Sequence, residues 1–292
     1  MTLASCTAVP TTQVSQRATS QERERAPAPK PAPAPEPSRP ATFAFAGELT
    51  QGGWIKGTAP GGTQSLSLDG ESIDVGENGG FFVAFDRDAK PVASLIATLR
   101  SGAKVVQRLT IAPRDWQIEN VNIARRRSGP SEAFMALRRP ELARIQAARA
   151  LDTGAAGWRQ DFIWPVTGRI SGRFGSQRVY RGEPGSYHSG IDITSGVSGT
   201  PFVAPADGVV VLAAKKPFTL EGNLLMIDHG MGLNSAFLHC SEILVEEGER
   251  VRQGQTIGRI GSTGRATGPH LHWSMKWNEA RLDPILLTGP MR

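Results

Sequence analysis

The stretch that decides the fold reads GPHLHW at residues 268–273, and it belongs with YHSGID at residues 187–192. Every histidine of the 292-residue chain lies between residues 188 and 272, at His188, His229, His239, His270 and His272. Side chains of an extended strand alternate between two faces, so His270 and His272 are expected on one face. Two imidazoles on one face need one carboxylate to complete a catalytic zinc site, and Asp192 can supply it. These residues predict a zinc hydrolase.

The charge and composition of the chain limit the classes of molecule that it is expected to bind. The formal charge is +6 and the pI about 9.7, which suits an anionic polymer such as bacterial cell wall as well as nucleic acid. The only tight basic run is at residues 125–127, which we interpret as a solvated linker, so no nucleic-acid groove is expected. Cys6 and Cys240 lie in segments of different character and are not expected to pair. No apolar run reaches the roughly 18 residues that a membrane-spanning helix needs.

Residues 1–41 are predicted to form a disordered linker. An Ala/Pro alternation from Ala26 to Pro40 favours extended polyproline II and cannot bury a core. Ahead of it, LASC at residues 3–6 resembles a bacterial lipobox, which makes Cys6 a candidate lipid anchor. Only Met1 and Thr2 precede this stretch, whereas a signal needs a charged and then an apolar segment. Either the true start lies upstream or the match is a coincidence.

Residues 42–112 are predicted to form a small antiparallel β-sandwich. Short apolar alternations such as 81–85 and 105–111 are separated by turn sequences at 60–62 and 78–80. The segment contains no histidine, no cysteine and no paired acids, so it is interpreted as a spacer or a wall-binding module.

Residues 113–158 are predicted to be a helical connector. Ser131 could cap a helix with Phe134, Met135 and Leu137 on its core face, and Pro140 is expected to break it or to start a second helix. The second helix would bury Leu142, Ile145 and Ala148 and end at Gly154.

Residues 159–292 are predicted to form one all-β catalytic domain with antiparallel strands separated by Gly-rich turns. The expected strands are 169–174, 201–205, 208–213, 224–228, 234–239, 256–260 and 270–276.

The histidines and acids divide into candidate ligands and structural residues. His188 and Asp192 lie a short loop apart, and Gly190 would allow a tight bend between them. One of His270 and His272 can complete the zinc site, and the other can act on the water or the developing oxyanion, with His239 as the second candidate for that role. The remaining residues are expected to be structural: His229, the turn formers Asp207 and Asp228, and Cys240 as a small apolar strand residue.

The segments 187–193, 199–210, 222–230, 237–241 and 261–272 together resemble the lysostaphin-like, LytM-type zinc endopeptidases of bacterial cell walls. The resemblance covers residues 163–287, in order and nearly without gaps. It implies one zinc per chain held by His188, Asp192 and His272, with His239 and His270 lining the cleft as base and oxyanion-stabilising groups. Two positions depart from the family pattern: Phe237 stands where Tyr is frequent, and Cys240 where Leu is usual. Neither removes a ligand.

The resemblance implies a zinc metallo-endopeptidase that hydrolyses the peptide cross-links of peptidoglycan through zinc-activated water. Peptidoglycan stem peptides would be its partners, nucleic acid would not, and the expected form is a monomer in the cell envelope, periplasmic or anchored as a lipoprotein. The loop 178–186 is expected to form part of the groove wall. The alternatives are a non-catalytic relative that binds wall or activates a cell-wall amidase, and a chain in which the N-terminal sandwich is the functional, binding part. The complete ligand set argues against the first, and the lack of an aromatic or charged cluster in the sandwich gives the second no support.

Overall fold

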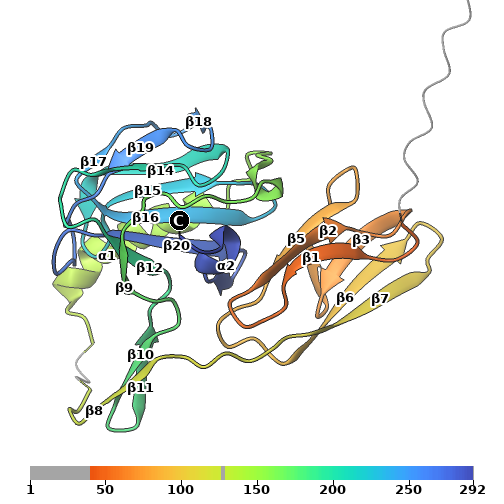
Figure 1. Ribbon diagram of the computed structural model, residues 1–292, viewed down its shortest axis with the longest axis horizontal. Helices are drawn as coiled ribbons and strands as arrows, with labels where there is room; N and C mark the ends of the chain where they lie inside the picture. Colours follow the sequence, from red (N-terminus) through yellow and green to blue (C-terminus); the bar gives the residue numbers. More distant parts are fainter. Residues whose placement is uncertain (1–39, 126–128, 292) are drawn as a thin grey trace, which may run out of the picture. The chain divides into compact units, whose positions relative to one another are not determined.

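The computed structural model describes residues 40–125 and 129–291 and is built mostly of β-strands (Figure 1). The predicted all-β class is confirmed. The lipobox-like stretch and the Ala/Pro segment lie outside the described residues. In the described part of the chain, no helix is long and apolar enough to cross a membrane.

The N-terminal sandwich consists of two antiparallel sheets, β1-β2-β5 and β4-β3-β6-β7. Strand β6 shows why the segment folds this way: Ala93, Leu95 and Ala97 are buried and alternate with partly exposed residues, so one face of the strand covers the core. The strand bounds are β1 Ala44–Glu48, β2 Trp54–Thr58, β3 Thr63–Leu68, β4 Glu71–Ile73, β5 Gly80–Ala84, β6 Val92–Leu99 and β7 Lys104–Thr110.

The connector contains a strand that the sequence analysis did not predict. Strand β8 (Ile118–Val121) pairs in parallel with β10 (Gln177–Tyr180), which pairs in turn with β11 (Glu183–Tyr187). The expected groove-wall loop at 178–186 is therefore largely a β-hairpin. Strand β8 is almost entirely exposed and has no apolar alternation, so only its partner strand defines it.

Helix α1 (Glu132–Arg149) corrects two predictions about the connector. The Ser131 hydroxyl accepts a hydrogen bond from the Phe134 amide at 3.2 Å, as expected for an N-cap. Pro140, however, neither breaks the helix nor starts a second one, and the helix ends at Arg149 rather than near Gly154. A proline inside a helix costs about 3 kcal/mol, which the contacts on both sides of it must offset.

The buried face of α1 also differs from the prediction. Leu137 and Leu142 are 62% and 37% exposed, whereas Ile145 and Ala148 pack on the central sheet of the C-terminal domain. Arg138 is buried because its guanidinium makes a bidentate ion pair with Glu221. An apolar periodicity could not predict this face, since a buried ion pair occupies part of it.

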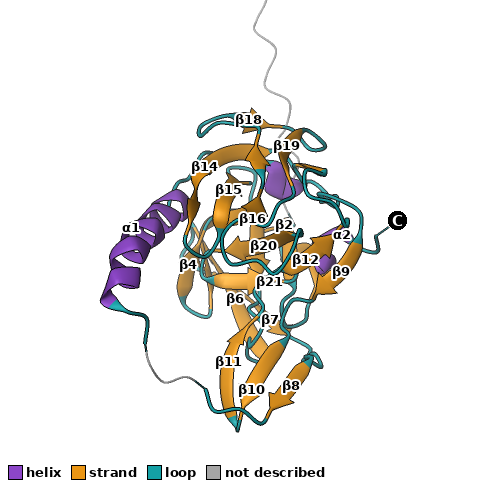
Figure 2. Ribbon diagram, turned by 90° about the vertical axis from the view of Figure 1, so that its left-hand side faces the viewer, coloured by secondary structure: helices purple, strands orange, loops and turns teal. Residues whose placement is uncertain are grey.

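The C-terminal domain has a central sheet in the order β18-β14-β15-β16-β20-β12-β9, with β21 paired to β20, and a small sheet β13-β19-β17 (Figure 2). All seven predicted strands of the domain are present, while β10, β11, β12, β17, β18 and β21 were not predicted. The bounds are β9 Arg169–Gly172, β12 Ile191–Thr194, β13 Pro201–Val203, β14 Gly208–Phe218, β15 Gly222–Asp228, β16 Leu233–Cys240, β17 Glu242–Ile243, β18 Arg250–Val251, β19 Thr256–Arg259, β20 Leu271–Trp277 and β21 Ala280–Leu282. The two short helical elements are η1 Gly157–Arg159 and α2 Ile285–Thr288.

Strand alternation in β20 separates the core from the functional face. Trp273 is fully buried and stacks in parallel on Phe237 at a centroid distance of 6.4 Å. Its neighbour His272 points to the opposite face, where the register places it beside Asp192 of β12. The apolar core under β20 thus fixes the strand that carries His272.

Candidate metal centre

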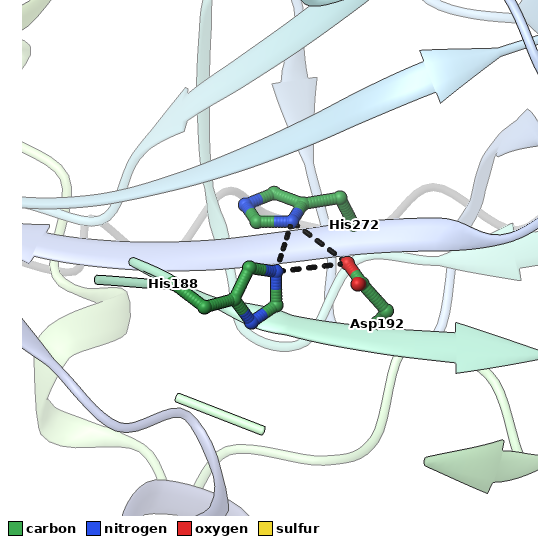
Figure 3. A group of neighbouring side chains, drawn as sticks. All are labelled: His188, Asp192 and His272. Carbon is green, nitrogen blue, oxygen red and sulfur yellow. Dashed lines mark hydrogen bonds and ion pairs between the residues drawn. The ribbon is translucent and has the colours of Figure 1, made fainter. Parts of the chain in front are cut away.

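Three polar side chains converge beside strands β12 and β20 of the central sheet (Figure 3). Oδ1 of Asp192 lies 3.1 Å from Nε2 of His188 and 2.8 Å from Nδ1 of His272, and these two nitrogens are 3.1 Å apart. Asp192 and His272 come from paired strands, and His188 from the segment between β11 and β12. The three side chains are 23%, 23% and 11% exposed for His188, Asp192 and His272, so the group is shielded but reachable from solvent.

The backbone fixes the orientation of His188. Its Nδ1 lies 3.1 Å from the carbonyl oxygen of Arg173, its amide donates to the Ser176 carbonyl at 2.8 Å, and its own carbonyl accepts from the Gly175 amide at 2.9 Å. An Nδ1–H held by a carbonyl leaves Nε2 with its lone pair free, which is the tautomer that a metal-binding histidine needs.

Two glycines leave room for the three side chains. A Cβ on Gly172 would lie 2.3 Å from Oδ2 of Asp192, and one on Gly190 would lie 2.8 Å from Nε2 of His272. Gly190 is not among the residues with a positive φ. The chain does bend at Gly190, as expected, and the position in addition has no room for a Cβ beside His272.

The charges of the cluster are coupled. Burial alone would raise the pKa of Asp192, but the hydrogen bonds and charges of the two imidazoles hold that pKa far below its ordinary range. Burial lowers the pKa of His188, but the hydrogen bond and the charge of Asp192, together with the Arg173 carbonyl, raise it by more, so the net shift is upward. For His272 burial dominates and the pKa is lowered. Asp192 thus strongly favours its ionised form, and the two imidazoles around it are shifted in opposite directions.

The donor set fits a zinc ion. Two imidazole nitrogens and one carboxylate oxygen match the three protein ligands of hydrolytic zinc sites, which leave a fourth position open. Ligands at about 2.0–2.1 Å from a tetrahedral metal would be about 3.3 Å apart, and the three atoms here are separated by 2.8 to 3.1 Å. A small outward movement of the side chains would seat the ion.

His239 and His270 flank the cluster and face one another at a ring-centroid distance of 5.0 Å. Nδ1 of His239 lies 2.9 Å from the Thr263 carbonyl oxygen, and Nδ1 of His270 lies 2.8 Å from that of Gly268. Nε2 of His270 is 3.7 Å from Oδ1 of Asp192, farther than the ring of His272. Each flanking imidazole has its Nδ1 held by the backbone and its Nε2 left for chemistry.

His239 has an unusual backbone conformation with a functional consequence. Its φ is +64°, and it lies in an irregular part of the pairing between β15 and β16. Bulges re-aim side chains, and a left-handed conformation is costly for a residue with a Cβ. Burial lowers the pKa of His239, against the hydrogen bond to Thr263, so the ring is neutral at pH 7 and can accept a proton.

A groove of about 1090 Å³ leads away from His188 and Asp192. Residues of the connector and of the β10–β11 hairpin form much of its wall, including Glu119, Arg125 and Arg178. Arg173 and Arg265 also line it, and Arg178 is paired with Glu119 at 2.6 Å. The groove is open and its lining carries more arginines than carboxylates, which suits a ligand with free carboxylates.

The residues predicted to be structural lie apart from this cluster. His229 is fully buried, with Nδ1 2.7 Å from the Asp207 carbonyl oxygen and Nε2 2.7 Å from the Ser235 hydroxyl. Asp228 accepts a hydrogen bond from the Gly230 amide at 2.9 Å. Cys240 is fully buried, and burial raises its pKa to about 12.

Sequence reasoning missed the groups that orient the cluster. These include the carbonyl of Arg173, the close approach of Gly172, and Arg87 of the sandwich, whose guanidinium contacts the segment that holds His188. Carbonyl acceptors have no signature in a sequence. Arg87 is far from His188 along the chain, and only the tertiary structure brings them together.

Comparisons with known proteins agree with this geometry. Residues 186–284 match the model of Peptidase family M23. This stretch is an M23 peptidase domain. The domain is 41% identical over 111 residues to the Vibrio cholerae peptidoglycan DD-endopeptidase ShyA, a match that covers 37% of this chain and 24% of that protein. It is 40% identical over 126 residues to the Neisseria meningitidis DD-carboxypeptidase/endopeptidase Mpg, covering 42% and 27%.

The two-part arrangement also has a counterpart. The crystal structure of a Pseudomonas aeruginosa protein described as an M23 peptidase matches this chain with a TM-score of 0.64 and 26% sequence identity. The match covers 84% of this chain and 96% of that one. The M23 domain of this chain therefore spans about a quarter of the two endopeptidases, whereas the P. aeruginosa likeness extends well beyond the domain.

Proposed function

We propose that the chain is a zinc endopeptidase that hydrolyses the peptide cross-links of peptidoglycan. The observation that carries the proposal is the convergence of His188, Asp192 and His272 on one point at the end of the groove. These residues would hold one zinc ion per chain. The names of the matched relatives support a DD-type cross-link between stem peptides as the substrate.

Bound zinc would polarise the scissile carbonyl and lower the pKa of a water ligand to about 7. The chain's own residues supply the remaining functions. Asp192 stays ionised over the whole working range and keeps the cluster attractive to a cation, because its pKa lies far below the ordinary value. Arg173 orients the His188 ring through its carbonyl oxygen.

His239 and His270 would move the proton and stabilise the oxyanion. A neutral imidazole whose Nδ1–H is held by a carbonyl presents Nε2 as an acceptor, and after protonation the same atom is a donor. His239 fits the role of base because burial keeps it neutral. His270, nearer to Asp192, fits the role of the group facing the oxyanion. The groove arginines would hold the substrate's carboxylates.

The test is metal content together with digestion of purified peptidoglycan, on the intact chain and on His272→Ala. We expect one zinc per chain, released peptides in the product chromatogram, and loss of both in the variant. Removing zinc with a chelator should abolish digestion, and adding zinc back should restore it. Tight binding to the wall without zinc and without digestion would contradict the enzyme and support the non-catalytic alternative.

We further propose that the protein works in the cell envelope, because its substrate lies outside the cytoplasmic membrane. The LASC stretch at residues 3–6 suggests an anchor at Cys6. Fractionation of cells that produce the natural gene product should find it with membranes, and Cys6→Ser should release it. An unchanged distribution in the variant would contradict the anchor and leave the enzyme proposal intact.

A further inference from the structure

Arg87 of the N-terminal sandwich is buried against the C-terminal domain. Its side chain is 7% exposed, although arginine is usually a surface residue. It follows β5 in the sequence, outside the M23 domain. The sandwich and the C-terminal domain belong to one compact unit.

The guanidinium of Arg87 is held on several sides. Nε donates to the Gly175 carbonyl at 3.0 Å, one terminal nitrogen donates to Oε1 of Gln177 at 3.1 Å, and the other pairs with Asp88 at 2.6 Å. The rings of Trp116 and Tyr187 lie 5.3 and 5.0 Å from its central carbon. Three polar partners and two aromatic faces compensate for part of the desolvation of the buried cation and restrict its orientation.

The groups that Arg87 holds are the ones that hold His188. Residues 173–176 bind the His188 backbone and imidazole through the carbonyls of Arg173 and Ser176 and the amide of Gly175. The Gly175 carbonyl, on the same residue as that amide, accepts the bond from Arg87. Tyr187, stacked under the guanidinium, directly precedes His188 in the chain.

Neighbouring residues tighten this support. The Tyr187 hydroxyl donates to Oδ1 of Asp86 at 3.2 Å, and Oδ2 of Asp86 accepts from the Arg281 amide at 2.9 Å. Gly175 has a φ of +78°, and a Cβ there would lie 2.1 Å from the ring of Trp116. The segment therefore has little room to move while Arg87 and Trp116 are in place.

We propose that Arg87 is a positioning residue for the metal centre: it fixes residues 173–177 and thereby the orientation of the His188 imidazole. The sandwich is then a structural part of the active site and more than a spacer. The inference rests on the proposed zinc endopeptidase function. Outer partners of metal ligands typically contribute 10- to 100-fold to metal affinity or activity.

The experiment compares full-length wild type with Arg87→Met, Arg87→Lys and the control Lys56→Met. Lys56 also joins the sandwich to the C-terminal domain, with bonds to the carbonyls of Arg159 and Gln160 at 3.1 and 2.8 Å, but it touches no residue around His188. Zinc affinity is measured by competition with a chelator, and kcat and KM on a cross-linked muropeptide. The absorption spectrum of the Co²⁺-loaded protein reports ligand geometry.

We expect Arg87→Met to lower zinc affinity and kcat by about 10- to 100-fold, to alter the Co²⁺ spectrum and to leave KM nearly unchanged. Arg87→Lys should not restore zinc affinity, because an ammonium cannot donate in the fixed fork that reaches Gly175 and Gln177 together. Lys56→Met should keep wild-type zinc affinity. Wild-type affinity and kcat in both Arg87 variants would overturn the proposal, and so would an equal loss in Lys56→Met.

Urea unfolding shows whether a variant that loses zinc affinity is still folded. If Arg87→Met does not fold, Gln177→Met, which removes one of the Arg87 bonds, should show a smaller loss of zinc affinity in the same direction; no loss there would overturn the proposal. The ¹⁵N signals of the His188 ring in the metal-free protein give a readout that needs no zinc. A wild type that binds no zinc would contradict the proposed function, while His188 ring signals identical to wild type in both Arg87→Met and Arg87→Lys would contradict the positioning role.

Discussion

His188 and His229 begin from the same arrangement and end in different roles. Each imidazole has Nδ1 next to a backbone carbonyl oxygen, that of Arg173 at 3.1 Å and that of Asp207 at 2.7 Å. The difference lies in the second nitrogen. Nε2 of His188 faces Asp192 and His272 at the end of a groove, whereas Nε2 of His229 is satisfied by the Ser235 hydroxyl inside the core. An imidazole whose Nδ1 is held by a backbone carbonyl is therefore not by itself a functional site. Its role depends on whether Nε2 is free and on which groups lie around that nitrogen.

The largest difference between the surroundings of His188 and His229 should appear when the carboxylate beside each histidine is neutralised. Asp192→Asn keeps the size of the side chain but removes the charge that faces both imidazoles, so we expect zinc to be lost and digestion to fall by at least about a thousandfold. The matched control is Asp228→Asn, in the buried region around His229. It should keep zinc and lose stability instead, because Asp228 accepts bonds from Thr153 and Gly230. Metal analysis, digestion assays and urea unfolding distinguish the two variants. Loss of zinc in both would contradict the different roles given to His188 and His229.

His239 tests whether a free nitrogen beside the cluster carries chemistry. His239→Gln removes the proposed base without removing a ligand, so kcat should fall by about a thousandfold while zinc content stays at the wild-type level. Steady-state kinetics with metal analysis checks this. A variant with full kcat would exclude His239 as the base and leave His270 as the candidate.

His229 should give the protein a pH-dependent stability. Burial lowers its pKa from 6.5 to about 4, so the unfolded chain binds more protons than the native chain between these values. The free energy of unfolding should therefore fall by up to about 3 kcal/mol as the pH drops from 6.5 to 4. Urea unfolding of the chelator-treated protein at several pH values measures it. His229→Gln should flatten this dependence, and an equally steep fall in the variant would contradict the assignment.

The smallest expected effect concerns Cys240, which follows His239 directly in the chain but faces the core. Its thiol is fully buried with a pKa raised to about 12, so it should react with a thiol reagent only as fast as the chain opens. Adding urea should accelerate the modification sharply. The measurement uses Cys6→Ser, so that one thiol is counted. Fast reaction in the native state would show that Cys240 is accessible from the groove.

Residue chemistry predicted much of the fold and the composition of the site. The seven strands expected in the C-terminal domain are present, because apolar alternation and glycine turns are local signals. Strand β8 and the hairpin β10–β11 were missed, because they are short, have no fully buried residue and are defined by one another. The buried face of α1 was wrong, since Arg138 is buried by an ion pair with Glu221, a partner distant in sequence.

The sequence by itself determined which groups are available: an all-β chain, two imidazoles on one strand end and a carboxylate near a third imidazole. Which ring nitrogen of His188, His239 and His270 is left free was decided by the tertiary structure, since that depends on the carbonyls of Arg173, Thr263 and Gly268. The same holds for the contribution of Arg87, which reaches the site only because the sandwich packs on the segment that holds His188. Side-chain identity is local information, whereas orientation is set by backbone groups that a sequence does not distinguish.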